Sequence, residues 1–271
     1  MLRRRGPLPY GRRMGFISYA ASDGIGTITI DRPEKKNAMT YAMLNELWDA
    51  LDEGAADDGA RALILTGVPG AFCAGTDLSD LQGTPEDQRS RGGQRRARGA
   101  SPLMECPKPI VCAIDGPAIG MGAEFTSMCD VRIATPRARF GWVFVHRGLV
   151  PDTGAGTWIL PRLLGVQATA RLLFSGEIMS AEDMAGMGYL AALVEPDELD
   201  AAARTEAARF ATGSPFAIAE TKALLYAGLG RSFDEHAKVN REVMERCFHS
   251  EDHKEGVASF LERRPPQFTG R

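Results

Sequence analysis

The chain has 271 residues, of which 44% are hydrophobic, 25% charged and 7% aromatic. This length suits one α/β domain, or one domain with a small extension, and the composition excludes a disordered, collagen-like or disulfide-stapled protein. The net charge is −3, and outside residues 1–14, which hold five Arg and no acid, 27 basic residues face 35 acidic ones, so most of the chain does not resemble a nucleic-acid-binding protein.

The sequence carries no obvious targeting or membrane signal. Its apolar runs are too short to span a bilayer, and Arg3–Arg5 are not followed by the apolar segment of a secretory signal. The five cysteines are odd in number, scattered and without a Cys-x-x-Cys pair, which indicates reduced, buried thiols and a cytoplasmic protein. Residues 1–14, rich in Arg, Gly and Pro, are expected to form a mobile basic tail.

Strands and helices alternate up to about residue 150. Gly26–Ile30 alternates β-branched residues and predicts a strand, and Thr40 is the expected N-cap of an amphipathic helix. Residues 79–103 are polar and rich in Gly and Arg, which predicts an exposed loop or a loose helix. Gly120–Cys129 predicts a short apolar helix. The other strand candidates are Arg61–Thr66, Ile110–Ile114, and Val131–Ala134 followed by Ala138–Val145, a pair close enough to form a hairpin.

From Gly154 onward the pattern becomes helical. Apolar residues recur at helical spacing, and Ser214-Pro215 has the cap and the first-turn proline of a helix start. With neither a repeat nor a linker that would separate two domains, the helical part is expected to pack on the core or on a neighbouring subunit. The segments are Trp158–Leu164, Ala168–Phe174, Ala181–Met187, Glu198–Phe210, 214 to about 229, and Phe233–Phe248.

Two glycine-rich segments each follow a buried strand, Phe72–Leu78 (FCAGTDL) and Asp115–Glu124 (DGPAIGMGAE). Small residues let a backbone approach a ligand closely, and N–H groups at a helix start are free donors. Two such backbones could hold one carbonyl oxygen, as in an oxyanion hole, beside a Glu124 whose pKa is raised by apolar neighbours. Tight packing glycines and a helix-capping glutamate explain the same residues, and the residues alone leave the two interpretations even.

Other kinds of site have little support. Gly24–Gly26 precedes a strand, which is the wrong order for a dinucleotide-binding loop, and Thr153–Thr157 (TGAGT) lacks a phosphate-binding lysine. His249 and His253 have helical spacing but no third ligand, so no metal site is predicted. The sequence also lacks the Gly-x-Ser-x-Gly elbow of the serine hydrolases.

Six stretches resemble the enoyl-CoA hydratase/isomerase (crotonase) superfamily, from about Gly15 to Gly270. Each stretch alone is weak evidence, whereas six in the order of the family are specific. The stretches are Ile28–Met39 (ITIDRPEKKNAM), Ala71–Leu78 (AFCAGTDL), Lys108–Glu124 (KPIVCAIDGPAIGMGAE), Met128–Ala134 (MCDVRIA), Gly148–Gly165 and Glu255–Pro266 (EGVASFLERRPP).

The resemblance implies an α/β fold of the crotonase type, a spiral of ββα turns followed by a C-terminal helical region that forms trimers, which commonly pair into hexamers. We therefore expect the tail 1–14, a crotonase core over 15–205 and a helical trimerisation region over 206–271. The resemblance further implies an acyl-CoA substrate in fatty-acid or related breakdown. Coenzyme A would enter as part of that substrate, without a metal or another cofactor.

The resemblance also assigns the reacting groups. In the family, the thioester oxygen lies between two backbone N–H groups, which match Thr76 and Met121. Hydratases of the family use two glutamates to hold and activate one water. The first matches Glu124, but the second falls at Phe144, whose ring can neither take a proton nor hold water firmly. Asp152 matches a position that dienoyl-CoA isomerases use, so Glu124 and Asp152 are the available pair.

These residues favour a double-bond shift or an atypical hydration, whereas the frequency of activities in the family favours hydration. Adding water needs a base for the water and a proton for C2, while a double-bond shift moves one proton between two carbons. Asp152 is equally well explained as a turn residue or as the N-cap of a helix over 153–164. Trp142, Phe144 and Trp158 are candidates for an acyl pocket or are ordinary core aromatics.

Coenzyme A contacts in the family come mainly from two backbone segments and from basic residues near the phosphates. The matching positions are Lys35, Lys36 and Ala38, together with Ala74, Asp77 and Leu78. The five arginines in 89–98 are either a further phosphate contact or a solvated surface. An RNA-binding homologue is the alternative in another class, and the acidic body of the chain with no interleaved aromatics disfavours it. A homologue that binds acyl-CoA without turnover is the other alternative.

Overall fold

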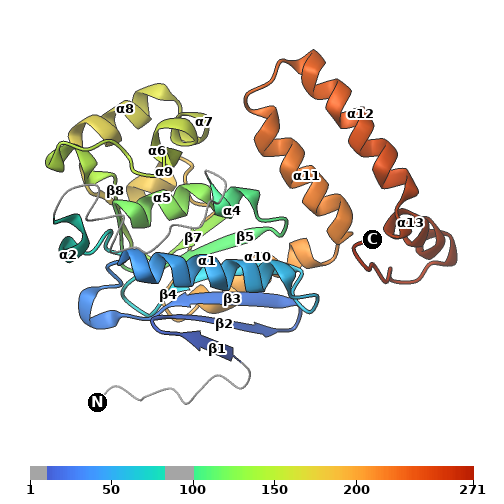
Figure 1. The fold of residues 1–271 in the computed structure, drawn as a ribbon, viewed down its shortest axis with the longest axis horizontal. Coiled ribbons are helices and arrows are strands. Elements are labelled where there is room, and N and C mark those ends of the chain that lie inside the picture. Colours follow the sequence, from blue (N-terminus) through green and yellow to red (C-terminus); the bar gives the residue numbers. More distant parts are fainter. Residues whose placement is uncertain (1–10, 83–100) are drawn as a thin grey trace.

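The computed structural model describes residues 11–82 and 101–271, and it has an α/β core with a helical region at its side (Figure 1). The strands are β1 Gly11–Met14, β2 Ile17–Ser22, β3 Ile25–Ile30, β4 Ala62–Gly67, β5 Ile110–Ile114, β6 Pro117–Ile119, β7 Val131–Ala134, β8 Arg139–Gly141, β9 Met179–Ser180 and β10 Ala192–Leu193. The first helices are α1 Tyr41–Ala56, α2 Leu78–Leu81, α4 Pro102–Glu105, α5 Met121–Met128, α6 Ala155–Trp158, α7 Leu160–Leu164, α8 Val166–Ser175 and α9 Ala181–Gly186. The last helices are α10 Leu199–Ala211, α11 Pro215–Gly228, α12 Phe233–His249 and α13 Glu251–Glu262, and the 3-10 turns are η1 Pro33–Lys35 and η2 Val143–Arg147.

The strands form two sheets, and from β5 to β8 successive strands alternate between them. The larger sheet has the order β1-β2-β3-β4-β5-β7-β10, antiparallel over its first three strands and parallel from β3 onward. The smaller sheet has the order β6-β8-β9, with β6 and β8 parallel. Strands β5 and β6 are followed by α5, and β7 and β8 begin the next turn. This confirms the α/β spiral of ββα turns that the sequence predicted.

The two faces of the larger sheet are covered by different helices. In β4, Leu63 and Leu65 pack on the side of α1 and α5, while Ala62 and Ile64 face α10. This division follows from the two-residue period of a strand, which sends neighbouring side chains to opposite faces. All four residues are buried, as expected for a parallel sheet that is covered on both sides.

Helices α11 to α13 stand beside the core in Figure 1. Lys222 and Tyr226 of α11 both hydrogen-bond the carboxylate of Asp130, at 2.7 Å each, and so tie this helix to the loop before β7. The predicted boundary between residues 205 and 206 falls inside α10. This helix buries Leu199 and Ala207 against the larger sheet, so it packs as part of the core.

Some local expectations are confirmed. The hydroxyl of Thr40 accepts a hydrogen bond from the Met43 N–H and caps α1. The helix predicted from Ser214-Pro215 starts at Pro215, and α12 begins at Phe233 as predicted.

Two expectations are corrected. Residues 11–14, assigned to the tail, form β1 and pair with β2. Strands β7 and β8 do not form a hairpin: β7 pairs with β5 in the larger sheet, and β8 pairs with β6 and β9 in the smaller one. The remainder of the predicted tail, residues 1–10, lies outside the described residues.

Candidate active site

The two glycine-rich segments lie side by side. The Cys73 N–H donates to the Pro117 carbonyl at 2.8 Å, and the Ile119 N–H donates to the Cys73 carbonyl at 3.0 Å, which forms a parallel bridge between Cys73 and Ala118. Three residues further along each segment come Thr76 and Met121. The shared register therefore brings together the two residues that the sequence analysis singled out as backbone donors.

Glycine is required where these segments meet. Gly75 has φ of +98° and Gly120 has φ of +54°, both in the region that favours glycine. A Cβ on Gly75 would lie 2.9 Å from the Ile119 carbonyl oxygen. The N–H groups of Thr76 and Met121 donate to no backbone or side-chain acceptor within the described residues. Two adjacent free donors are what a carbonyl oxygen that gains negative charge requires.

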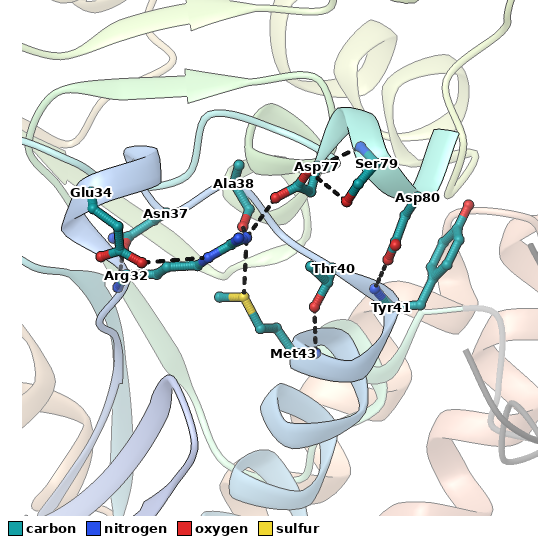
Figure 2. A network of polar contacts seen from close by, with 10 residues as sticks. All are labelled: Arg32, Glu34, Asn37, Ala38, Thr40, Tyr41, Met43, Asp77, Ser79 and Asp80. Atoms are coloured by element: carbon teal, nitrogen blue, oxygen red, sulfur yellow. Dashed lines mark hydrogen bonds and ion pairs between the residues drawn. The ribbon is translucent and has the colours of Figure 1, made fainter. Parts of the chain in front are cut away.

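The segment that carries Thr76 is held by backbone hydrogen bonds to Met39 and by an ion pair with Arg32. The Met39 N–H donates to the Gly75 carbonyl at 2.7 Å, and the Asp77 N–H donates to the Met39 carbonyl at 2.8 Å. Figure 2 shows the Arg32 guanidinium reaching both the Ala38 carbonyl, at 2.9 Å, and the Asp77 carboxylate, at 2.7 Å. These contacts fix the loop on one side of the donor pair.

Asp77 also starts α2. Its carboxylate accepts hydrogen bonds from the backbone N–H and the hydroxyl of Ser79, and with the Arg32 ion pair these lower its pKa to about 2. On the same short helix, Asp80 accepts from the Tyr41 N–H at 2.7 Å (Figure 2). The side chain of Asp77 therefore has a structural part in shaping the loop.

Glu124 lies in the first turn of α5, one turn after Met121, and its side chain is 0% exposed. The hydroxyl of Thr153 donates a hydrogen bond to its Oε2 atom. Burial raises the pKa of Glu124, and the negative charge of Asp152 raises it further, while hydrogen bonding from Thr153 acts in the opposite direction. The net shift is upward, so Glu124 holds a proton more tightly than an exposed glutamate does, which favours a part in proton transfer.

The other carboxylate oxygen of Glu124 has a different environment. Oε1 is buried and has no hydrogen-bond partner among the residues that the structure describes, and the same is true of the nearby Trp142 indole nitrogen. A Cβ on Gly156 would lie 2.5 Å from Oε1 and 3.0 Å from Cδ1 of Trp142. The absence of a side chain at residue 156 therefore leaves room for the carboxylate.

Asp152 is exposed and lies close enough to Glu124 for its charge to raise the pKa of that residue. The alternative in which Asp152 caps a helix over 153–164 is wrong. The helix begins at Ala155, and the Ala155 N–H donates to the hydroxyl of Thr153, at 3.2 Å. The structure thus brings Asp152 to the site without giving it the capping role.

Phe144 lies at the oxyanion segment. It is buried in η2, and its Cζ atom is 3.9 Å from the position that a Cβ on Gly120 would take. An aromatic ring therefore lies where the sequence analysis placed the second glutamate of the hydratases. Trp142 is fully buried and packs edge-on against Tyr189, with ring centroids 5.9 Å apart, so it belongs to the core.

An apolar cavity of about 600 Å³ lies between the core and α11. Thr153, whose hydroxyl donates a hydrogen bond to Glu124, is in the wall of this cavity. Trp158, which the sequence analysis suggested for an acyl pocket, also lines it, together with Met104 of α4 and Ala223 of α11. The polar groups of Lys222 and Tyr226 in its wall are already paired with Asp130.

Most of the predicted coenzyme A contacts lie in the segment that carries Thr76 or in the segment hydrogen-bonded to it. Lys36 and Leu78 are exposed, the latter by 62%, while Ala38 and Ala74 are half-buried. The Ala74 N–H donates to the Lys36 carbonyl at 3.0 Å, which joins the two segments that the sequence analysis paired. The Arg-rich segment 89–98 lies outside the described residues.

No group of three or more His, Cys, Asp or Glu in residues 11–82 and 101–271 is arranged to hold a metal ion. In the same part of the chain, no helix combines the length and the apolarity needed to cross a bilayer. All five cysteines are free thiols.

Known proteins resemble the chain over almost its whole length. The sequence model of the enoyl-CoA hydratase/isomerase family matches residues 20–271. The chain belongs to this family.

Among its relatives, a protein of Rhodobacter capsulatus named "probable enoyl-CoA hydratase" is 38% identical, over 94% of this chain and 98% of the relative. The 1,2-epoxyphenylacetyl-CoA isomerase of Escherichia coli is 34% identical, over 95% of this chain and all of the relative. The crystal structure of an enoyl-CoA hydratase from Mycobacterium tuberculosis superposes with a TM-score of 0.83 at 31% identity, over 95% of this chain and all of that one.

For this member of the enoyl-CoA hydratase/isomerase family, sequence reasoning missed three residues that shape the site. Thr153 and Gly156 belong to the TGAGT segment, which the sequence analysis tested only as a phosphate-binding loop. Arg32 lies directly before Pro33 in Ile28–Met39, the first segment that resembles the family, and no sequence pattern marked it as part of the site. The position of Thr153, directly after Asp152, was the only local hint, because the contact with Glu124 joins residues 29 apart.

Proposed function

We propose that the protein is an enzyme that moves a proton on an unsaturated acyl-CoA thioester and thereby shifts a double bond. The N–H groups of Thr76 and Met121 would bind the thioester oxygen, and Glu124 would remove the proton and return it. The observation that carries the proposal is the convergence of two free backbone donors and one buried carboxylate with a raised pKa. Donors aimed at a developing enolate oxygen are a major source of rate enhancement.

Isomerisation is preferred to hydration because of the second acid/base position. Phe144 supplies a ring at that position, so the site lacks a second buried carboxylate to hold water there. Asp152 is the other carboxylate near Glu124, and its exposure suits a group that assists proton return from the side of the solvent. The isomerase from Escherichia coli is named for an epoxide, so it is a relative that isomerises a CoA thioester without a named double-bond shift, whereas the relatives named as hydratases support hydration, the second candidate.

The cavity beside Thr153 is proposed to hold the acyl group. Its volume of about 600 Å³ and its wall of Met, Trp and Ala side chains suit an apolar chain or ring. The coenzyme A part would lie along Ala38 and Ala74–Leu78, with Lys36 near the phosphates. No metal or separate cofactor takes part in this proposal, because the oxyanion donors supply the stabilisation of charge.

We also propose a trimer or a pair of trimers. Large apolar side chains are strongly exposed on α8, α12 and α13, namely Val166, Phe174, Phe233, Phe260 and Leu261, each at 74% or more. Side chains of this kind mark contacts between subunits where they gather into one continuous patch. Light scattering on the purified protein tests the assembly. A cytoplasmic location agrees with the five free thiols.

The function is tested by incubating the protein with trans-2- and trans-3-enoyl-CoA of short and medium chain and following the products by mass and chromatography. Conversion of the 3-enoyl to the 2-enoyl compound without a change of mass is expected. A gain of one water from the 2-enoyl substrate would instead establish hydration. Binding without any turnover, or RNA binding that weakens with salt, would contradict the proposal.

The matched variant for this assay is Glu124→Gln, which keeps the shape of the side chain and removes its basicity. We expect it to fold and to lose most of its activity, by roughly 10²- to 10⁴-fold, the usual contribution of a positioned acid or base. Turnover at the wild-type rate would exclude Glu124 as the group that moves the proton.

A further inference from the structure

The cavity and the proposed base are connected by one side chain. Glu124 is 0% exposed and is not part of the cavity wall, whereas Thr153 lines the cavity and donates its hydroxyl proton to Oε2 of Glu124. The Ala155 N–H donates to the same hydroxyl, at 3.2 Å, and so occupies one of its lone pairs. This arrangement directs the single hydroxyl proton of Thr153 toward the carboxylate.

Among the donors that face the Glu124 carboxylate, the Thr153 hydroxyl has the strongest effect on its pKa, ahead of the Gly156 N–H and the Trp142 indole N–H. The second oxygen, Oε1, has no partner, and the indole N–H of Trp142 beside it is likewise unpaired. Gly156 leaves space at this oxygen, and its N–H lowers the pKa of Glu124 less than the Thr153 hydroxyl does. The orientation of the carboxylate therefore depends on the hydroxyl at residue 153.

We propose that Thr153 is the positioning residue for Glu124: its hydroxyl, in the wall of the acyl cavity, fixes the carboxylate behind that wall and stabilises it in the ionised form that removes a proton. This inference rests on the proposed function of the site and deepens it. Thr153 takes no part in the proton transfer itself, because its proton stays in the bond to Oε2 and its oxygen stays bound to the Ala155 N–H.

The groups that face Glu124 predict how its titration depends on Thr153. Burial and the negative charge of Asp152, which comes from the segment before α6, both raise the pKa of Glu124. Hydrogen bonding from Thr153 lowers it, as the donors of Trp142 and Gly156 do to a smaller extent. Loss of the hydroxyl should therefore raise the pKa, so that the base is ionised only at higher pH.

The decisive comparison is between Thr153→Val, which keeps the branched shape and loses the hydroxyl, and Thr153→Ser, which keeps the hydroxyl. We expect Thr153→Val to lower kcat about tenfold to hundredfold with little change in KM, because a base that is not held in place reacts poorly. The acid limb of its pH–rate profile should move to higher pH. Thr153→Ser should restore both the rate and the profile.

Thr157→Val is the matched control. Thr157 is exposed in the same helical segment, and its hydroxyl donates to the Gly154 carbonyl at 3.1 Å without touching Glu124. The same chemical change at residue 157 should leave kcat and the pH profile as in the wild type. An equal effect of both valine substitutions would show that the segment is merely sensitive to any change, and would overturn the inference.

A measurement without substrate separates this inference from the proposed function. The ¹³C resonance of the Glu124 carboxyl, identified by its loss in Glu124→Gln, is titrated in the wild type and in Thr153→Val. An upward shift of its pKa in the variant supports the inference even if the wild type turns over none of the enoyl-CoA substrates, in which case only the proposed function fails. An unchanged titration and an unchanged pH profile, with a lower melting temperature alone, would reduce Thr153 to a structural residue and overturn the inference.

Discussion

The Gly156→Ala substitution tests whether the position of Glu124 matters. The added Cβ would lie 2.5 Å from Oε1 of Glu124, where ordinary contacts begin at 3.4 Å. The carboxylate would therefore have to move by about 0.9 Å in a close-packed interior. A displacement of about 1 Å at a reacting group costs roughly 10²-fold in rate, so we expect kcat to fall about a hundredfold.

The structural cost of the same substitution is smaller than its kinetic cost. Overpacking of an interior costs about 1–3 kcal/mol, which lowers Tm by roughly 2–10 °C for a chain of this size. The assay compares kcat, KM and Tm of Gly156→Ala with those of Gly186→Ala. Gly186 ends α9, and a Cβ there would meet no atom within 4 Å, so its variant should resemble the wild type. Wild-type kcat in a folded Gly156→Ala protein would refute the dependence on the position of Glu124.

Three further substitutions probe the site and its support. Phe144→Glu places a carboxylate beside the oxyanion segment. We expect this variant to form a hydrated product, detected as a mass gain of one water, that the wild type does not form. If no water is gained, Phe144 is not the residue that prevents hydration. Lys222→Met leaves Asp130 without its ion pair, 2.7 Å long in the wild type, and should cost about 3 kcal/mol in a chemical denaturation experiment; an unchanged midpoint would show that α11 does not depend on the pair. Asp77, with its pKa lowered to about 2 from 3.8, stabilises the fold above its ordinary pKa, so the Tm advantage of the wild type over Asp77→Asn should shrink as the pH falls from about 4 toward 2. An advantage that does not depend on pH would exclude the ionised Asp77 carboxylate, with its hydrogen bonds from Ser79 and its ion pair with Arg32, as its source.

Local structure followed from local sequence where a short-range rule decides it. Thr40 caps α1 because a hydroxyl before an apolar helical pattern can accept from the N–H of the third helical residue. The start of α12 has a full capping box, in which Ser232 and Glu235 satisfy each other's backbone N–H groups. Such signals need only a few consecutive residues, and no tertiary contact overrides them here.

Strand pairing could not be predicted in the same way. Val131–Ala134 and Ala138–Val145 are neighbours in sequence and suggested a hairpin, yet the strands found there, β7 and β8, each pair with a different strand of the preceding turn. The repeating ββα path decides this arrangement, because it sends the two strands of each turn to two sheets. Hydrophobic patterning specifies which faces of a strand are buried, but not its neighbour.

Contacts between distant residues in the site could not be predicted from the sequence either. Thr76, Met121 and Glu124 could be singled out from glycine spacing and family resemblance, and the bridge between Cys73 and Ala118 brings the first two into one register. The contact between Thr153 and Glu124 could not, because it joins a turn and a helix whose separation only the fold defines. A threonine in a Gly-rich turn has no sequence pattern that distinguishes a positioning hydroxyl from a local turn contact.

The burial of Glu124 should also make the stability of the folded protein depend on pH. The pKa of Glu124 is raised in the folded protein above its ordinary value of 4.5, so the folded state binds the proton more tightly than the unfolded state does. The wild type therefore loses stability as the pH rises from 4.5 through the folded pKa, and carries the full cost above it. Glu124→Gln has no such cost, so its Tm relative to the wild type should rise between pH 4.5 and pH 8. A difference in Tm that falls over this range would mean that the folded protein favours the ionised carboxylate, and would contradict burial as the dominant influence on Glu124.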